Sequence, residues 1–406
     1  MEKKEKHIIY ILDSLSASCV YDKKNNTGID LKKIQNNFFS KISKNALFFR
    51  NNYGYGNTHD FIHSLLSKVN INKSLSDTNF RRTEYNNPIG YYNKNAFKKI
   101  FFNNSNHLLG EYYKKQFPNF LDCFDVCQLE SLGINKVKDD FITFCKKKKI
   151  NEIAKDNKIF FYIHEMSPHD NKFLMKGTTE NNYLKIVNQI GKKVKKDLEF
   201  INYDEKIDTL IFLSDHGATF NPSVEIWKSK KIKKKLYDRY YSEVFNEKKI
   251  KIVFFIKNAR IKKNYIDKNL NPNHFFPIID FILKNKFKFL KKKIFSEILD
   301  YINLKYTSLK APPVSSGIYI NNFITNYIHS FFIFFDKKKI VYCHNHPSQF
   351  IEMETLKNVD KDQIKTEIKL FLSNYFNIFN FLYRIIYIFF REIFAKILKL
   401  FKIIHN

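Results

Sequence analysis

Two side chains that are typical metal ligands stand directly after a short apolar run. Residues 210–217 are Leu-Ile-Phe-Leu-Ser-Asp-His-Gly, so Asp215 and His216 follow apolar residues and a single serine. Such a run predicts a buried strand of a parallel sheet, and open α/β sheets bind ligands at the carboxyl ends of these strands. An Asp with a His suits a divalent metal, Zn²⁺ or Mn²⁺ before Mg²⁺ or Ca²⁺. The alternative is an ordinary strand end that faces water.

An acid also ends the first apolar run of the chain. Residues 7–13 are His-Ile-Ile-Tyr-Ile-Leu-Asp, which predicts a strand that stops at Asp13. Asp13 is therefore a second candidate metal ligand, although it lies far from Asp215 in the sequence. The competing interpretation is a helix cap, because Ser14 and Ser16 follow and short polar side chains are preferred at that position.

Thr58 is the candidate nucleophile. It follows a turn that Gly54 and Gly56 permit, and it precedes apolar residues with helical spacing. These apolar residues are Phe61, Ile62, Leu65 and Leu66. A hydroxyl at the start of a helix is commonly an N-cap. The same position also favours a nucleophile, because the helix dipole attracts an anionic substrate and a metal can ionise the hydroxyl.

Two histidines follow a third apolar run. Residues 158–163, Lys-Ile-Phe-Phe-Tyr-Ile, predict another buried strand, and His164 and His169 come after it. Imidazoles at a strand end can bind a metal or the oxyanion of a substrate, whereas loop histidines without such a role lie on the surface. Both interpretations stay open from the sequence.

The elements that must position these side chains follow from the remaining patterns. Helices are expected at residues 183–200 and 273–283, and further strands at residues 250–256, 317–321, 330–335 and 339–343. Residues 68–157 are rich in Lys, Asn and Phe and carry no chemical constellation, so we expect an insertion between sheet elements. Pro312-Pro313 marks a domain boundary.

Composition limits the class of protein. The 406 residues are 44% hydrophobic and include 43 Phe, enough for a large core. The five cysteines have no paired spacing, so we expect neither a disulfide framework nor a structural zinc site. The first apolar run is too short for a signal peptide or a membrane span, which predicts a cytoplasmic protein. The formal charge of +30 comes without a nucleic-acid-binding motif, so we expect no nucleic-acid partner.

The last forty residues have a different character. Residues 368–404 are dominated by Phe, Ile, Leu and Tyr, and several basic residues fall in one sector of a helix. These basic residues are Arg384, Arg391, Lys399 and Lys402. A basic, aromatic amphipathic helix suits the surface of an anionic membrane, and we expect peripheral contact with the inner membrane face. The alternative is a helix that packs on the protein itself or on a second copy.

Together, these segments resemble the alkaline phosphatase superfamily, on the branch of sulfatases, phosphoethanolamine transferases and lipoteichoic acid synthases. The order of the parts is similar: an acid that ends the first strand, a nucleophile that opens a helix, a strand that ends in His, and then Ser-Asp-His-Gly. The similarity spans residues 7–345, and Ser-Asp-His-Gly at residues 214–217 is its most specific motif.

The resemblance implies a role for each candidate residue. Asp13, Asp215 and His216 match metal ligands, and Thr58 matches the nucleophile, which also contacts the metal. The stretch that begins at His164 resembles the His-Thr-Met-Gly-Ser-His segment of phosphoethanolamine transferases.

That segment implies substrate binding by His164 and His169, with His169 also stabilising the transferred group.

Two departures qualify the resemblance. Thr58-His-Asp-Phe-Ile lacks the Pro and Arg of the sulfatase Cys/Ser-x-Pro-x-Arg motif, so conversion to formylglycine is not expected. Residues 218–230 lack the later His of the transferases, which puts a second metal in doubt.

The implied architecture is a three-layer α/β/α sandwich of the alkaline phosphatase type. We expect a catalytic domain at residues 1–312, a small β subdomain at 313–358 and the amphipathic helical tail at 359–406. The implied activity is metal-dependent transfer of a phosphoryl substituent through Thr58, from a phospholipid or nucleotide-type phosphodiester donor to a lipid-linked or surface glycan on the cytoplasmic side. The alternatives are a sulfatase-like phosphodiesterase, phosphatase or sulfuric-ester hydrolase, and a non-catalytic scaffold of a glycan-assembly complex.

Overall fold

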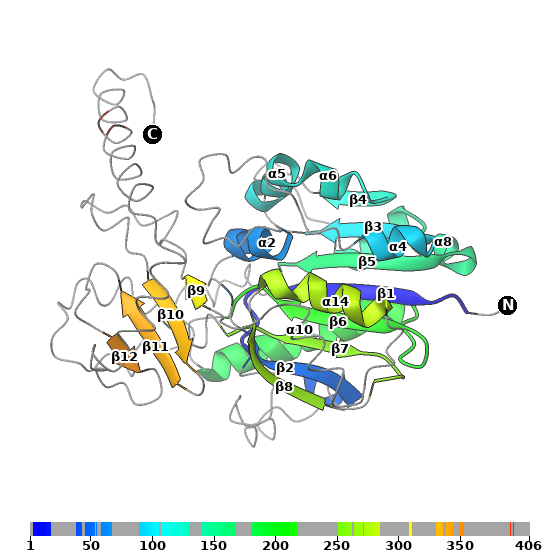
Figure 1. Cartoon of the computed structure of the whole chain (residues 1–406). Coiled ribbons are helices and arrows are strands. Elements are labelled where there is room, and N and C mark those ends of the chain that lie inside the picture. The colour runs from blue at the N-terminus through cyan, green and yellow to red at the C-terminus, as the bar shows by residue number, and fades with distance from the viewer. Residues whose placement is uncertain are drawn as a thin grey trace. The chain divides into compact units, whose positions relative to one another are not determined.

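The apolar runs of the sequence form the strands of one eight-stranded sheet in the computed structural model (Figure 1). Its strands are β1 (Lys6–Leu12), β2 (Ala46–Asn52), β3 (Phe97–Asn103), β4 (Val126–Leu129), β5 (Lys158–Glu165), β6 (Thr209–Ser214), β7 (Phe254–Lys257) and β8 (Asn264–Leu270). The strand order is β4-β3-β5-β1-β6-β7-β2-β8. Every neighbouring pair is parallel except the two that involve β7. The strands that carry the candidate residues, β5, β1 and β6, therefore lie side by side at the centre.

The structure describes a defined part of the chain. The described residues are 3–17, 38–42, 45–52, 54, 58–66, 89–104, 107–129, 140–166, 180–217, 251–261, 264–270, 272–284, 308–310, 330–335, 338–343, 350–352, 390 and 393. The chain forms two compact units, residues 1–68 with 84–307 and residues 69–83 with 308–406.

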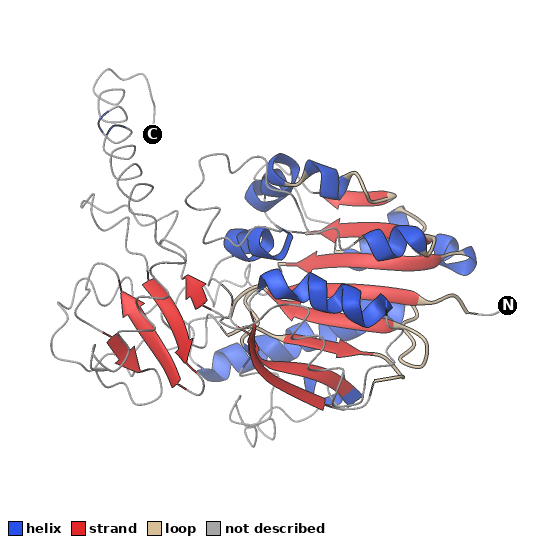
Figure 2. Cartoon of the chain, viewed as in Figure 1, coloured by secondary structure: helices blue, strands red, loops and turns tan. Residues whose placement is uncertain are grey.

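Helices cover both faces of the large sheet (Figure 2). One face carries α1 (Phe38–Ile42), α7 (Phe141–Lys147), α8 (Ile150–Asp156) and α10 (Glu180–Phe200). The other carries α2 (Thr58–Leu66), α4 (Gly90–Lys94), α5 (His107–Gln116), α6 (Pro118–Leu121) and α14 (Phe275–Lys284), which the 3₁₀ helix η7 (Pro272–His274) precedes. The three-layer α/β/α architecture expected from the sequence is thus confirmed.

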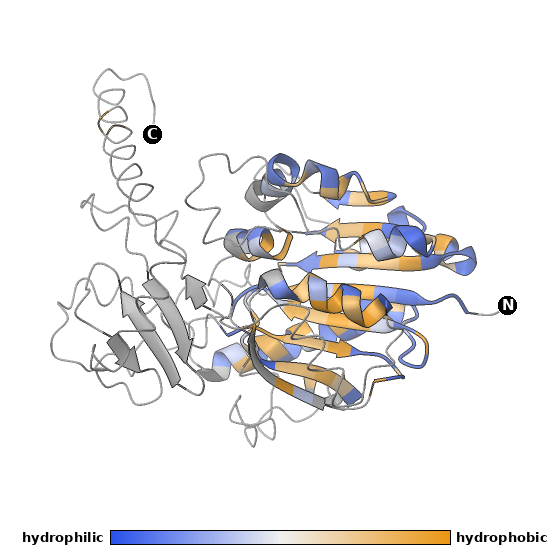
Figure 3. Ribbon diagram, viewed as in Figure 1, coloured by the Kyte–Doolittle hydropathy of each residue, from blue (hydrophilic) through white to orange (hydrophobic). Residues whose placement is uncertain are grey.

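Alternation along each strand explains the two faces. In β1, Ile8, Tyr10 and Leu12 pack in the core beneath α10, whereas Ile9 and Ile11 pack in the core beneath α2 and α14. Successive strand residues point to opposite faces, so a fully apolar strand fills two cores at once. Figure 3 shows this apolar character along much of the sheet and along α14.

Several sequence predictions can be compared with these elements. The helix expected at residues 183–200 is α10, which begins three residues earlier, at Glu180. The helix expected at 273–283 corresponds to η7 and α14. Within residues 68–157, the segment expected to be an insertion, the structure places β3 and β4 in the main sheet.

The second unit contains a four-stranded antiparallel sheet. Its strands are β9 (Ser308–Lys310), β10 (Ser330–Phe335), β11 (Lys338–Cys343) and β12 (Phe350–Glu352), in the order β12-β11-β10-β9. The strands predicted at 330–335 and 339–343 are therefore confirmed, with β9 lying before Pro312-Pro313. The strand expected at 317–321 lies outside the described residues, as does all of the expected tail helix except two positions.

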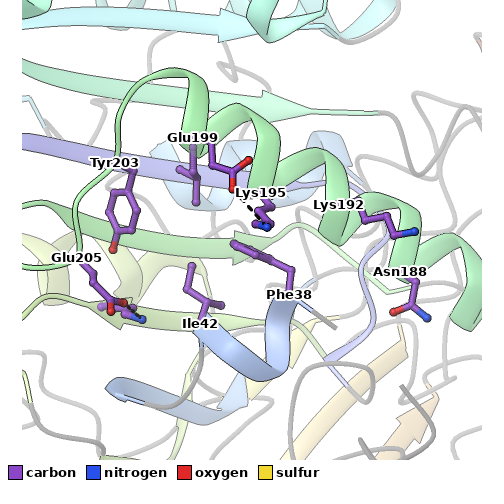
Figure 4. Close-up of a pocket in the computed structure, with 10 residues that line it drawn as sticks. Phe38, Ile42, Asn188, Lys192, Lys195, Glu199, Tyr203 and Glu205 are labelled. Carbon is purple, nitrogen blue, oxygen red and sulfur yellow. Dashed lines mark ion pairs between the residues drawn. The ribbon is translucent and has the colours of Figure 1, made fainter. Parts of the chain in front are cut away.

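A cavity of about 750 Å³ lies against α1 and α10 (Figure 4). Its described lining residues are Phe38, Ile42, Asn188, Lys192, Lys195, Leu198, Glu199, Tyr203, Glu205 and Lys257. Lys257 pairs with Leu210, near the start of β6. The cavity therefore lies near the amino end of β6, whereas Asp215 follows its carboxyl end. In the described part of the chain, no helix has the length and apolar character needed to cross a bilayer.

Candidate active site

The register of the central strands brings two distant acids together. β1 and β6 are parallel, and Leu12 pairs with Ser214, the last residue of β6. Asp13 and Asp215 are therefore the next residues of two adjacent strands and lie at the same edge of the sheet. The backbone N–H of Asp215 donates to the carbonyl of Leu12 at 3.4 Å, and that of Asp13 donates to the carbonyl of Glu165, at the end of β5, at 3.0 Å.

Helix α2 places Thr58 over this edge. Its apolar residues Phe61, Ile62 and Leu65 are fully buried, which packs the helix on the sheet. Thr58 is the first helical residue, and its Oγ1 lies 2.7 Å from Asp215 Oδ2 and 3.2 Å from Asp13 Oδ2. The hydroxyl therefore lies between the two carboxylates.

Gly54 permits the close packing of the chain that leads to this helix. A Cβ at position 54 would lie 2.8 Å from the carbonyl oxygen of Asp215 and 3.1 Å from Cγ2 of Ile252. A side chain there would collide with the backbone of the site, so the residue must be glycine or the backbone must move.

His216 completes a set of four donors. Its Nε2 lies 3.5 Å from Asp13 Oδ1, 3.6 Å from Asp215 Oδ2 and 3.5 Å from Thr58 Oγ1. Its Nδ1 lies 2.7 Å from the carbonyl oxygen of Gly217. Because a carbonyl oxygen only accepts, Nδ1 donates to Gly217, and Nε2 faces the two carboxylates.

The donor set fits a divalent cation. Asp13, Asp215 and His216 each offer one ligand atom, and these atoms lie within 4.8 Å of one another. All three residues are buried, so the alternative of a strand end that faces water is wrong. Burial raises the pKa of Asp215 to about 6, and the neighbouring Asp13 carboxylate adds to the rise. Two carboxylates buried side by side repel each other, and a bound cation would remove that repulsion. Carboxylate oxygens with one imidazole suit Zn²⁺ or Mn²⁺.

His164 lies at the end of β5, beside these strands. It is fully buried, and its Nδ1 lies 3.2 Å from the hydroxyl of Tyr113 on α5. Its Nε2 has no hydrogen-bond partner among the described residues. Burial lowers the pKa of His164 to about 4, so the imidazole is neutral near pH 7. His169, the other predicted substrate-binding residue, lies outside the described residues.

The contribution of Ser14 to the site was not predicted from the sequence. Its backbone N–H donates to Asp215 Oδ1 at 3.0 Å, and its hydroxyl donates to Asp13 Oδ1. A serine after a strand is compatible with many roles, and a helix cap was one of them. Because β6 lies beside β1, Ser14 can hydrogen-bond to both Asp13 and Asp215, and this contact is seen only in the folded chain.

Comparison with known proteins agrees with this fold. No protein-family model and no curated protein sequence matches the chain. Among solved structures, it is similar to a putative sulfatase from Bacteroides thetaiotaomicron, with TM-score 0.57, 12% identity and 92% of each chain covered.

It is also similar to a 2-O GAG sulfatase, with TM-score 0.56, 10% identity and 92% of each chain covered. A protein of the alkaline phosphatase superfamily from Vibrio parahaemolyticus gives TM-score 0.52 at 12% identity, over 89% of this chain and 84% of that one. Identities this low show a shared fold. The chain therefore has the fold of the alkaline phosphatase superfamily and its sulfatases, the group that its sequence resembles.

Proposed function

We propose that this protein is a metal-dependent enzyme that transfers a phosphoryl substituent through a covalent intermediate on Thr58. The observation that carries the proposal is the Thr58 hydroxyl at 2.7 and 3.2 Å from two buried carboxylates, with the Nε2 of His216 at 3.5 Å. A hydroxyl among three candidate metal ligands at a sheet edge has the surroundings that an activated nucleophile requires.

The residues of the chain divide the chemistry between them. The Thr58 hydroxyl donates to Asp215 Oδ2, which is positioned to accept the proton as Thr58 Oγ1 bonds to phosphorus. The bond from phosphorus to the donor alcohol breaks in the same step, and the leaving oxygen takes up the proton that Thr58 gave up. The hydroxyl of an acceptor later displaces Thr58, and its proton returns to the Thr58 oxygen. A bound divalent ion, held by Asp13, Asp215 and His216, would supply charge neutralisation and lower the pKa of the Thr58 hydroxyl. We assign His164 and His169 to the substrate oxygens, as the sequence resemblance implies.

Phosphate is favoured over sulfate by the identity of the nucleophile. Sulfatases of the formylglycine type carry a Cys or Ser side chain that has been oxidised to an aldehyde. Threonine cannot give this aldehyde, because the carbon that carries its hydroxyl also carries a methyl group. Thr58 also lacks the surrounding Pro and Arg of that motif. An unmodified threonine hydroxyl can form a phosphoester directly, which supports transfer from a phosphodiester donor of the phospholipid or nucleotide type.

The C-terminal tail supports an acceptor at a membrane surface. Phe390 and Ile393, the two described tail residues, are each helical and exposed. Exposed apolar residues within a basic sequence are suited to an anionic membrane surface. We include in the proposal a lipid-linked or surface glycan as acceptor, reached from the cytoplasmic side of the membrane.

Mass spectrometry of the intact protein and its peptides tests the proposal. The protein is incubated with Mn²⁺ or Zn²⁺ and with phospholipid and nucleotide-type phosphodiester donors. We expect a donor-dependent mass increase on the peptide that contains Thr58. Thr58→Ala should abolish the adduct, whereas Thr58→Ser, which retains a hydroxyl, should retain it.

The outcomes separate the competing functions. Breakdown of the adduct by water alone would indicate a hydrolase, and breakdown that requires a glycan would indicate a transferase. If the wild-type protein binds metal but forms no adduct and consumes no donor, the proposed mechanism is wrong. If it binds no metal, a non-catalytic scaffold explains the fold better.

A further inference from the structure

A turn at Ser14 controls one oxygen of each candidate metal-binding carboxylate. The N–H of Ser14 donates to Asp215 Oδ1 at 3.0 Å, and its hydroxyl donates to Asp13 Oδ1. The other oxygen of each carboxylate, Oδ2, faces the hydroxyl of Thr58. Asp215 Oδ1 also accepts from the backbone N–H of His216 at 2.6 Å. Ser14 thus contributes to the orientation of both carboxylates, and its backbone conformation sets where its N–H and hydroxyl lie.

That conformation is unfavourable for serine. Ser14 has a φ angle of 59°, in the left-handed region, where a side chain crowds its own backbone. Non-glycine residues remain in this region only when surrounding contacts hold them there. Contacts that hold Ser14 would therefore also hold the two acids.

Tyr183, on helix α10, makes these contacts from the side of the sheet away from α2. Its hydroxyl donates to the carbonyl oxygen of Ser14 at 2.7 Å and accepts from the backbone N–H of Ser16 at 2.8 Å. The directions are unambiguous, since a carbonyl only accepts and an N–H only donates. The side chain is buried, at 1% exposed, and belongs to the core beneath α10. One hydroxyl thus hydrogen-bonds to the backbone at both Ser14 and Ser16.

We propose that Tyr183 is a positioning residue for the metal site: its hydroxyl holds Ser14 in the left-handed conformation that points the carboxylates of Asp13 and Asp215 at the metal. The inference rests on the proposed function. Tyr183 itself is not a ligand in this scheme, and its effect passes through Ser14. Groups that orient metal ligands in this way typically change metal affinity by about 10–100-fold when removed.

Binding of Co²⁺ alone to the full-length chain tests the inference. Affinity is measured by calorimetry, and the visible absorption of bound Co²⁺ reports the geometry of its ligands. We expect Tyr183→Phe to bind Co²⁺ about 10–100-fold more weakly than wild type and to give a changed absorption spectrum. A merely structural role would lower stability without changing the spectrum of the folded, metal-bound protein.

Tyr10→Phe is a matched control. The hydroxyl of Tyr10 also joins β1 to α10, by donating to Asp197 Oδ2 at 2.7 Å, and the side chain is also fully buried. This variant removes a buried tyrosine hydroxyl from the same interface without touching Ser14. It should leave the affinity and the spectrum of bound Co²⁺ unchanged.

Coupling to Ser14 provides a second test. Ser14→Ala removes the hydroxyl bond to Asp13, and if both residues act through one turn, the loss in the double variant should be smaller than the product of the two single losses. If Tyr183→Phe does not fold, Ser14→Ala remains as the test. Unchanged Co²⁺ affinity and spectrum in Ser14→Ala would show that the Ser14 hydroxyl does not orient Asp13, which contradicts the inference.

Two results overturn the inference while leaving the metal site intact. One is wild-type affinity and spectrum in Tyr183→Phe, and the other is an equal loss of affinity in Tyr10→Phe. Failure of the wild-type protein to bind Co²⁺ would instead overturn the proposed function, and this inference with it. The wild-type titration therefore distinguishes the two failures.

Discussion

Two pairs of buried carboxylates lie near the carboxyl ends of the central strands, and their negative charges are compensated differently. Asp13 and Asp215 form the candidate metal site. Glu165 and Asp197 form a second pair, which Lys193 bridges with Nζ–O distances of 2.6 and 3.0 Å. Both pairs are almost completely shielded from solvent. Only the second pair has a lysine or arginine partner among the described contacts.

The electrostatic consequences differ, although burial raises the pKa of Asp197 as well as that of Asp215. Burial alone would lower the pKa of Lys193, but the Glu165 and Asp197 carboxylates outweigh it and the pKa is raised. At the other pair, burial and Asp13 raise the pKa of Asp215 to about 6, which disfavours its charged form. The comparison shows that one carboxylate pair is a closed structural network and that the other has the charge to hold a cation.

Lys193→Met should have the largest effect on stability. It leaves Glu165 and Asp197 buried without their cation, and breaking a buried ion pair in this way costs about 3–5 kcal/mol of unfolding free energy. Urea denaturation, monitored by circular dichroism, measures the change. Adding metal should not restore the loss, because the affected carboxylates belong to the structural network.

Lys195→Met on the same helix is the matched control. Lys195 pairs with Glu199 at 3.3 Å, but both side chains are more than half exposed. An exposed pair contributes at most about 1 kcal/mol. Equal destabilisation by both substitutions would contradict the contrast between a buried network and a surface pair.

Metal bound at Asp13 and Asp215 should raise the unfolding free energy by less than Lys193→Met lowers it. A ligand at 100 times its dissociation constant adds about 2.7 kcal/mol to the unfolding free energy if it binds only the folded chain. Denaturation with and without Mn²⁺ or Zn²⁺ measures this increment. Asp13→Asn, which preserves shape and an acceptor for Ser14, should remove most of it. Retention of the full increment in this variant would place the metal elsewhere.

Acidification should destabilise the protein through buried histidines that lie away from both carboxylate pairs. Burial lowers the pKa of His63 and of His274 from 6.5 to about 4. Between these values the unfolded chain binds a proton that the folded chain does not, so stability is complete above pH 6.5 and falls as the pH drops toward 4. Each histidine contributes about 1.4 kcal/mol per pH unit within this window.

Urea denaturation between pH 7.5 and 5 measures the slope of unfolding free energy against pH. His274→Asn should reduce this slope by the contribution of one histidine. An unchanged slope would show that His274 does not remain neutral in the folded protein.

Local pattern predicted much of this architecture. The apolar runs before Asp13, His164 and Asp215 are the strands β1, β5 and β6, and the helical spacing of residues 183–200 marks α10. Strand and helix periodicities appear directly in sequence, because burial repeats every two residues in one and about every 3.6 in the other. The participation of β3 and β4 in the main sheet was not visible, since the Lys- and Asn-rich surroundings of these strands obscure them.

The residue types and apolar runs alone indicate which residues have the chemistry and that Asp13, His164 and Asp215 stand at strand ends. The folded chain is needed to show that β1 and β6 are neighbours, so that two acids about 200 positions apart share the hydroxyl of Thr58. The same holds for the contact of Tyr183 with Ser14 and for the bridge that Lys193 forms between Glu165 and Asp197. These contacts depend on strand order and on the packing of α10 against the sheet, which no local pattern of residues encodes.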